Sequence, residues 1–237
     1  MYKRTDWELS LGQEKAFWLR DKERVCSEWW LELKKNRANR LRDRLSTWMT
    51  LGEDSMILQI GSGPEGEINF LKGSRRFAID PLANFYKSEF SQILDPSVSL
   101  KDGVGEELPY EDNMFDLVLI CNALDHTYDP PRVLSQIHRV LRSGGICHVA
   151  VHAYPPVWIQ PLKLLKRIQG SKDHPWRYTP RRIIKDICAS HFHVLETTHG
   201  NEDELSIPNW LPLDLKLRVA RSVGLNAPML HVLAAKY

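Results

Sequence analysis

A glycine-rich turn and an acidic residue that follows it are the features of this 237-residue chain best suited to binding a ligand. The turn is Gly61-Ser62-Gly63-Pro64-Glu65-Gly66, and it directly follows the apolar run Met56–Ile60. Glycines are needed where a backbone bends sharply and must approach a ligand without a Cβ in the way. Asp80 ends the next apolar run, where a carboxylate can accept hydrogen bonds from both hydroxyls of a ribose. The pattern predicts a ribose-containing ligand.

Two residues of the turn bear on which ligand this is, because the pairing with Asp80 also fits a dinucleotide site. Pro64 removes one amide donor, and Glu65 places negative charge near the position of a pyrophosphate. S-adenosylmethionine has no phosphate and carries a cationic sulfonium, so it tolerates both residues. The turn therefore favours S-adenosylmethionine over a nicotinamide dinucleotide.

Short apolar runs alternate with amphipathic segments along the rest of the chain. The predicted strands are Met56–Ile60, Arg76–Ile79, Phe115–Cys121, Ile146–Val151, Phe192–Thr197 and Met229–Lys236. The predicted helices are Glu65–Leu71, Pro131–Leu141 and Thr179–Ser190, and Pro155–Gly170 is a candidate lid or packing helix, with a membrane-surface helix as the alternative. This alternation predicts an α/β fold with a parallel sheet covered by helices on both faces.

Three further segments occur in a recognisable order: Gly105-Glu106-Glu107-Leu108-Pro109-Tyr110, Asp112-Asn113-Met114-Phe115-Asp116-Leu117-Val118 and Arg139-Val140-Leu141-Arg142-Ser143-Gly144-Gly145. Together with the turn and Asp80 they resemble the small-molecule branch of the class I S-adenosylmethionine-dependent methyltransferases. The ordered match runs from Met56 to about Val151. The resemblance implies a Rossmann-like, seven-stranded, mostly parallel sheet with a reversed final hairpin.

The resemblance also implies which residues hold the cofactor, S-adenosylmethionine. They share positions in turns at the ends of strands: Gly61, Ser62, Gly63, Gly66, Asp80, Pro81, Leu82, Gly105, Glu106, Asn122, Ala123 and Leu124. The turn would face the methionine portion and Asp80 the ribose. Pro81, Leu82, Gly105 and Glu106 would surround the adenine, and residues 122–124 would lie under the sulfonium.

Two positions depart from the family pattern. Gln59 stands where relatives often carry an acid, which weakens a charge contact to the cofactor's amino group. Val104 stands where many relatives carry an acid that hydrogen-bonds the adenine amine. The turn and Asp80 are unaffected, so we expect cofactor binding with an altered set of polar contacts.

The candidate catalytic residues are Asp125 and His126, which follow a central strand at the edge where open α/β sheets place their ligands. Histidine can take a proton from a hydroxyl or amine near neutral pH, so His126 is either a base or a positioning residue. Asp125 either orients it or fixes the loop. His152 and Tyr154 emerge at the same edge and are candidate substrate-binding residues. No His, Asp or Glu cluster has metal-ligand spacing, so we expect no metal.

The first 50 residues are predicted to form an N-terminal helical arm, with residues 51–237 as the methyltransferase domain. Leucines recur at helical spacing there, and five of the chain's eight tryptophans are Trp7, Trp18, Trp29, Trp30 and Trp48. These tryptophans either pack the arm onto the main body or line a substrate pocket.

The composition of the chain limits the classes of partner that we expect it to bind. The formal net charge of +2 gives no general reason to expect a nucleic-acid partner, and no apolar run reaches the roughly 20 residues of a membrane helix. Met1–Ser10 is charged, so no secretory signal is expected, and the four scattered cysteines form no CxxC pair. We expect a cytoplasmic protein with a small-molecule partner.

The sequence thus predicts an enzyme that transfers a methyl group to oxygen or nitrogen of a small molecule. Leu124-Asp125-His126 with Asp129-Pro130 looks similar to methyltransferases of saccharide and surface-polymer biosynthesis, which suggests a sugar-containing acceptor. The alternatives are a non-catalytic S-adenosylmethionine-binding module, favoured by Gln59 and Val104, and a nicotinamide-dependent oxidoreductase.

Overall fold

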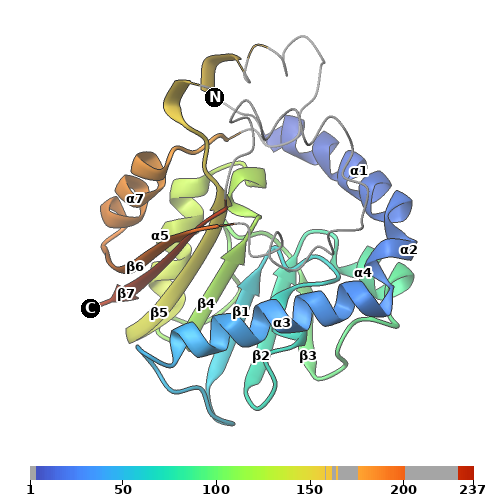
Figure 1. The fold of residues 1–237 in the computed structure, drawn as a ribbon, viewed down its shortest axis with the longest axis horizontal. Coiled ribbons are helices and arrows are strands. Elements are labelled where there is room, and N and C mark those ends of the chain that lie inside the picture. Colours follow the sequence, from blue (N-terminus) through green and yellow to red (C-terminus); the bar gives the residue numbers. More distant parts are fainter. Residues whose placement is uncertain (1–3, 158, 162–163, 165–175, 201–228) are drawn as a thin grey trace.

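The computed structural model describes residues 4–157, 159–161, 164, 176–200 and 229–237, and these form a seven-stranded sheet with helices around it (Figure 1). The order of strands is β3-β2-β1-β4-β5-β7-β6. Their bounds are β1 Met56–Ile60, β2 Arg75–Asp80, β3 Val98–Asp102, β4 Phe115–Cys121, β5 Leu141–His152, β6 Phe192–His199 and β7 Met229–Lys236. β7 pairs antiparallel with both β5 and β6, and the other pairs are parallel. The predicted fold class, including the reversed hairpin, is confirmed.

The register brings the ends of the central strands to one edge. Ile60 lies opposite Ile79 of β2 and opposite Ile120 of β4. The turn after β1, Asp80 at the end of β2 and the loop after β4 therefore begin at the same level. The chain leaves β1 toward β2 on one side and reaches β4 on the other, which is the topological switch point where such sheets bind ligands.

Helices cover both faces of the sheet. α5 (Pro130–Val140) and α7 (Pro180–Ala189) pack against one face in the largest apolar cluster, whose members include Val133, Ile137 and Ile183. Each begins at a side-chain cap with proline in the first turn: Asp129 accepts from the Arg132 amide, and Thr179 from the Arg182 amide.

The N-terminal arm supplies three helices, α1 (Arg4–Arg20), α2 (Lys22–Val25) and α3 (Glu28–Leu45). α3 covers the second face of the sheet, where Ala38, Leu41 and Leu45 join an apolar cluster with β1 and β4. α2 packs on α4 (Ala83–Glu89) through Val25. α1 buries only Trp7 among its own residues and lies across the edge where the strands end (Figure 1). The predicted helical arm is present.

The helix predicted over Glu65–Leu71 is wrong. Only a short 3-10 helix, η1 (Glu67–Asn69), follows the turn. The Gln59 side chain accepts from the Ile68 amide at 2.8 Å, and Glu65 and Glu67 point to basic residues of α3, so side chains replace the missing helical contacts. β3 and α4 were not predicted, and residues 155–170 lie largely outside the described part of the chain. Within the described ranges no helix combines the length and apolar character of a membrane crossing.

Candidate functional site

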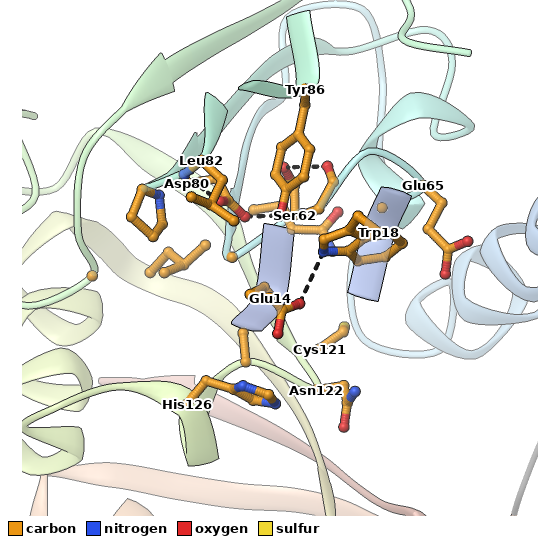
Figure 2. A pocket seen from close by; sticks show the side chains of 18 of the residues that line it. Glu14, Trp18, Ser62, Glu65, Asp80, Leu82, Tyr86, Cys121, Asn122 and His126 are labelled. Carbon is orange, nitrogen blue, oxygen red and sulfur yellow. Dashed lines mark hydrogen bonds between the residues drawn. The ribbon is translucent and has the colours of Figure 1, made fainter. Parts of the chain in front are cut away.

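A cavity of about 600 Å³ lies at the edge where β1, β2 and β4 end, between those strands and helix α1 (Figure 2). Its size is that of a small-molecule or cofactor site. The sheet side contributes the glycine turn, the end of β2 and the loop after β4, while the arm contributes aromatic and charged side chains. The lining residues on which the site depends are Glu14, Trp18, Gly61, Ser62, Gly63, Gly66, Asp80, Pro81, Leu82, Gly105, Glu106, Asn122, Ala123, His126 and His152.

The turn after β1 requires glycine at two positions. Gly61 has φ of +62° and Gly63 has φ of +56°, a left-handed conformation that residues with a Cβ rarely adopt. A Cβ at Gly61 would lie 2.4 Å from the Ala123 Cβ, and one at Gly63 would lie 3.2 Å from the Trp18 ring. The turn is therefore pressed between the β4 loop on one side and the arm on the other.

Asp80 ties the turn to the end of β2. Its Oδ2 accepts from the Gly63 amide at 3.0 Å and its Oδ1 accepts from the Leu82 amide at 2.9 Å. A carboxylate has about four acceptor positions, so about two remain for hydroxyl groups of a ligand. Burial raises the pKa of Asp80 to about 6, against the lowering effect of the two amide hydrogen bonds. Asp80 thus holds the shape of the turn and can still accept hydrogen bonds from a ligand.

Charged residues of α3 hold the other side of the turn. Lys34 Nζ lies 2.7 Å from Glu65 Oε1, and the Trp30 indole N–H donates to the same carboxylate. Arg37 lies 3.6 Å from Glu67. Burial alone would raise the pKa of Glu67, but the positive charges of Arg37 and Lys34 lower it to about 2. Glu67 is therefore ionised at neutral pH, and both Glu65 and Glu67 pair with basic side chains of the arm.

Gln59, which stands where relatives often carry an acid, has a structural role. Gln59 is buried, its Nε2 donates to Glu67 Oε2 at 2.8 Å and its Oε1 accepts from the Ile68 amide. Both ends of the amide are therefore used inside the protein. Gln59 lines the cavity but brings no charge to a ligand.

The expected adenine pocket is lined by Pro81, Leu82, Gly105 and Glu106. A Cβ at Gly105 would lie 2.9 Å from Ile60 Cγ2, so the glycine allows this loop to pack on β1. Glu106 Oε1 accepts from the amides of residues 128 and 129 at 2.8 and 3.1 Å. One oxygen of Glu106 therefore fixes the following loop, and its assigned contact with adenine stays a prediction.

The loop after β4 presents Asn122, Ala123 and His126 to the cavity. Asn122 has φ of +51°, and its amide donates to the Ala150 carbonyl at 2.7 Å. Leu124 and Asp125 are buried and are not among the described residues that line the cavity. Asp125 lies in the short 3-10 helix η2 (Leu124–His126) that carries His126. The structure thus brings His126 to the cavity, and the catalytic roles of both residues stay predictions.

The two candidate substrate-binding residues differ in whether they line the cavity. His152, at the end of β5, lines the cavity. Tyr154 is not among its described lining residues: its amide donates to the Tyr178 carbonyl at 2.8 Å, and Arg177 lies over its ring. A role for Tyr154 in substrate binding gains no support from this placement and also stays a prediction.

Sequence reasoning did not identify Glu14 and Lys34 as site residues. It left two roles open for the tryptophans of the arm, which were packing onto the main body and lining a substrate pocket. Trp7, Trp18 and Trp30 line the cavity, and each also packs against the main domain or pairs with it. That tryptophans of the arm line a substrate pocket stays a prediction. Trp29 and Trp48 are largely exposed. The signal that could have found Glu14 is its spacing from Trp18, one helical turn away on the same face.

Comparison with known proteins agrees with this geometry. Residues 58–149 match a family model described as a methyltransferase domain, and this range contains the end of β1, the turn, Asp80 and the β4 loop. The matched residues make up less than half of the chain, and over this region the chain is similar to a methyltransferase domain. The arm and the final hairpin lie outside the matched residues of this methyltransferase domain.

Three similar proteins show the range of chemistry on this fold. The sarcosine/dimethylglycine N-methyltransferase of Halorhodospira halochloris is 34% identical over 102 residues, which are 40% of this chain and 37% of that protein. The geranyl diphosphate C-methyltransferase of Streptomyces coelicolor, solved with S-adenosyl-L-homocysteine, superposes with a TM-score of 0.66 at 16% identity, covering 85% of this chain and 79% of the other. The [4+2]-cyclase SpnF has a TM-score of 0.59 at 17% identity, covering 83% and 80%.

Proposed function

We propose that this chain is an S-adenosylmethionine-dependent methyltransferase that acts on nitrogen or oxygen of a small molecule. The observation that carries the proposal is the joint placement of the glycine turn and Asp80 on one cavity of about 600 Å³ at the switch point of the sheet. The hydrogen bond between the Gly63 amide and Asp80 makes them one unit. The match of this region to the methyltransferase domain supports the same conclusion.

The residues present fit an adenosyl group. Asp80 keeps free acceptor positions for ribose hydroxyls, and Leu82 and Pro81 provide an apolar edge beside it. Because Gly61 has no side chain, the turn can pack closely against Ala123, and both residues line the cavity. When bound, S-adenosylmethionine would supply a methyl group attached to a cationic sulfur, and the neutral thioether is a good leaving group.

The contribution of the protein is then to position the acceptor and to remove its proton. Positioning supplies much of the acceleration of a displacement reaction. His126 and His152 both reach the cavity, so either can accept a proton from an amine or hydroxyl. We assign His126 as the candidate base because it lies on the loop that also carries Asn122 and Ala123.

For the acceptor, we propose a small polar molecule with an amine or a sugar hydroxyl. The N-methyltransferase similarity supports an amine, and the motif around Asp125-His126 suggested a saccharide. We further propose that residues 1–50 act as a cap over residues 51–237, because α1 lines the cavity from outside the sheet.

The test is methyl transfer itself, because a similar fold also carries a cyclase. Radiolabelled S-adenosylmethionine is incubated with the protein and two acceptor sets, glycine derivatives and nucleotide-free sugars, and labelled product and S-adenosylhomocysteine are counted together. We expect stoichiometric transfer to one set and its loss in His126→Ala. Tight cofactor binding with no transfer to either set, or binding of NAD alone, would contradict the proposal.

A further inference from the structure

We propose that Glu14, on the N-terminal arm, is the carboxylate that binds the positively charged methionine half of S-adenosylmethionine. The inference rests on the proposed function and assigns to the arm a cofactor contact that the sheet does not make. The group bound is an onium cation, either the α-ammonium or the sulfonium of the cofactor.

The first argument is the state of the carboxylates around the cavity. Five line it: Glu14, Glu65, Glu67, Asp80 and Glu106. Both oxygens of Glu65 and Glu67 already have partners within the protein, and Asp80, which accepts from two backbone amides, is assigned to the ribose hydroxyls. Glu106 is 1% exposed and holds the loop at the adenine end. Glu14 is only half-buried, and it is therefore the acid best able to meet a ligand charge.

The second argument is the way Glu14 is held. Its Oε1 accepts from the Trp18 indole N–H at 2.9 Å, and no hydrogen bond to its Oε2 occurs among the described residues. Trp18 is itself fixed, because its ring packs edge-on against Tyr86 and Phe90 and lies against Gly63. One oxygen is therefore anchored by a rigid group and the other is left for a ligand.

The third argument is position. Figure 2 shows the Glu14 side chain entering the cavity with Ser62 of the glycine turn on one side and His126 and Asn122 on the other. Asp80 would hold the ribose, and the adenine end is marked by Leu82 and Glu106, so the methionine half extends toward the turn and Asn122. Glu14 would therefore lie beside the methionine half of the cofactor. Its negative charge also contributes, after burial, to the raised pKa of Asp80.

The fourth argument is charge balance. Lys34 and Arg37 line the cavity but pair with Glu65 and Glu67, and Arg24 pairs with Asp21 at 2.6 Å. Gln59 is neutral, and its amide nitrogen and oxygen each have a partner within the protein. A cation entering this part of the cavity therefore meets Glu14, which has no cationic partner among the described residues. Water is partly excluded there, so the attraction is stronger than in bulk water.

The experiment compares three nucleosides by calorimetry: S-adenosylmethionine, which has both cations, S-adenosylhomocysteine, which has only the ammonium, and 5′-methylthioadenosine, which has neither. The variant is Glu14→Gln, which keeps shape and removes charge. The matched control is Glu8→Gln on the same helix, because Glu8 is exposed and, within the described part of the chain, its one ion pair is with Arg4 at 3.4 Å.

We expect Glu14→Gln to weaken S-adenosylmethionine binding about tenfold, which is about 1.4 kcal/mol, with 5′-methylthioadenosine unchanged. A parallel loss for S-adenosylhomocysteine identifies the ammonium as the group bound, and its retention identifies the sulfonium. Glu8→Gln should change none of the three affinities.

Two results would overturn the inference: unchanged binding of all three nucleosides, or an equal loss for all three, which would show a general effect on the site. An unchanged cofactor affinity with a raised KM for the acceptor would also overturn it and place Glu14 in the acceptor pocket. Failure of the wild-type protein to bind any of the three would instead refute the proposed function.

Discussion

The cavity has two walls of different construction. The wall formed by the sheet consists of backbone and small or buried groups: the glycine turn, the anchored carboxylate of Asp80 and the left-handed Asn122. The wall formed by the arm consists of long side chains on helix surfaces, such as Glu14, Trp18 and Lys34. The match to the methyltransferase domain covers the first wall and leaves out the second.

The difference teaches how the two halves of a ligand site can be specified separately. On the proposed function, backbone geometry at the strand ends would fix where an adenosyl group lies, and this geometry tolerates few substitutions. Side chains on a covering helix can change without disturbing the sheet, so they are suited to selecting what enters beside the cofactor. On this account, changes to the sheet wall should be more damaging than changes to the arm.

The largest effect is expected for Gly61→Ala. The added Cβ meets Ala123 at 2.4 Å and must adopt a left-handed φ. The strain of about 1–2 kcal/mol and the overpacking of about 1–3 kcal/mol add to a loss of about 3 kcal/mol in the free energy of unfolding. Urea denaturation measures this, and we expect cofactor affinity to fall as well.

Gly52→Ala is the matched control, because a Cβ there meets no atom within 4 Å and the backbone φ is not positive. Its effect should stay within about 0.5 kcal/mol. Equal effects of the two substitutions would show that the turn is not under the constraint described.

A smaller loss in the free energy of unfolding is expected at the ion pair that joins the arm to the glycine turn. Lys34→Met leaves Glu65 without its ion-pair partner at a position where both side chains are only 11–13% exposed. Removing one member of a fully buried pair costs about 3–5 kcal/mol, and partial exposure reduces this to about 2 kcal/mol. Chemical denaturation of the variant tests the value.

The control for this change is Lys35→Met on the same helix. Lys35 pairs with Glu32, and both side chains are more than half exposed, so its loss should cost less than about 1 kcal/mol. A Lys34 variant as stable as the Lys35 variant would mean that the arm does not brace the glycine turn.

Sequence reasoning predicted the sheet wall well because its signals are local. The run Met56–Ile60, the glycines after it and Asp80 report backbone geometry directly, and the two late strands carry clear apolar patterns. β3 was missed because none of its residues, Val98–Asp102, is fully buried, so it lacks an apolar run. The helix after the turn was predicted from its place in the alternation of strands and helices. In the structure, side chains of α3 and Gln59 instead bind the polar groups of this segment.

The arm could be predicted as helical but not as part of the site. Whether Trp18 faces the cavity depends on how α1 crosses the sheet edge, which is a long-range property. α1 shows almost no amphipathic pattern and buries only Trp7, so its sequence gives no clear inward face. The pairing of Lys34 with Glu65 likewise joins segments that only the fold brings together.

The next effect is a pH dependence of cofactor binding. Burial raises the pKa of Asp80 to about 6 in the free protein, and the ionised form accepts ribose hydroxyls better. Binding should therefore release a proton, and affinity should weaken as pH falls through 6, by about tenfold between pH 7 and pH 5. Calorimetry across this range tests it. Asp80→Asn should flatten the profile, and a flat profile in the wild-type protein would contradict the assignment.

The most direct test of the central claim is the affinity for S-adenosylhomocysteine of Asp80→Ala measured beside Asp102→Ala. Asp102 ends the neighbouring strand in register with Asp80 but is exposed. If the glycine turn and Asp80 hold the adenosyl group, Asp80→Ala weakens binding at least about tenfold while Asp102→Ala leaves it unchanged. Equal affinities for the two variants and the wild-type protein would contradict the account.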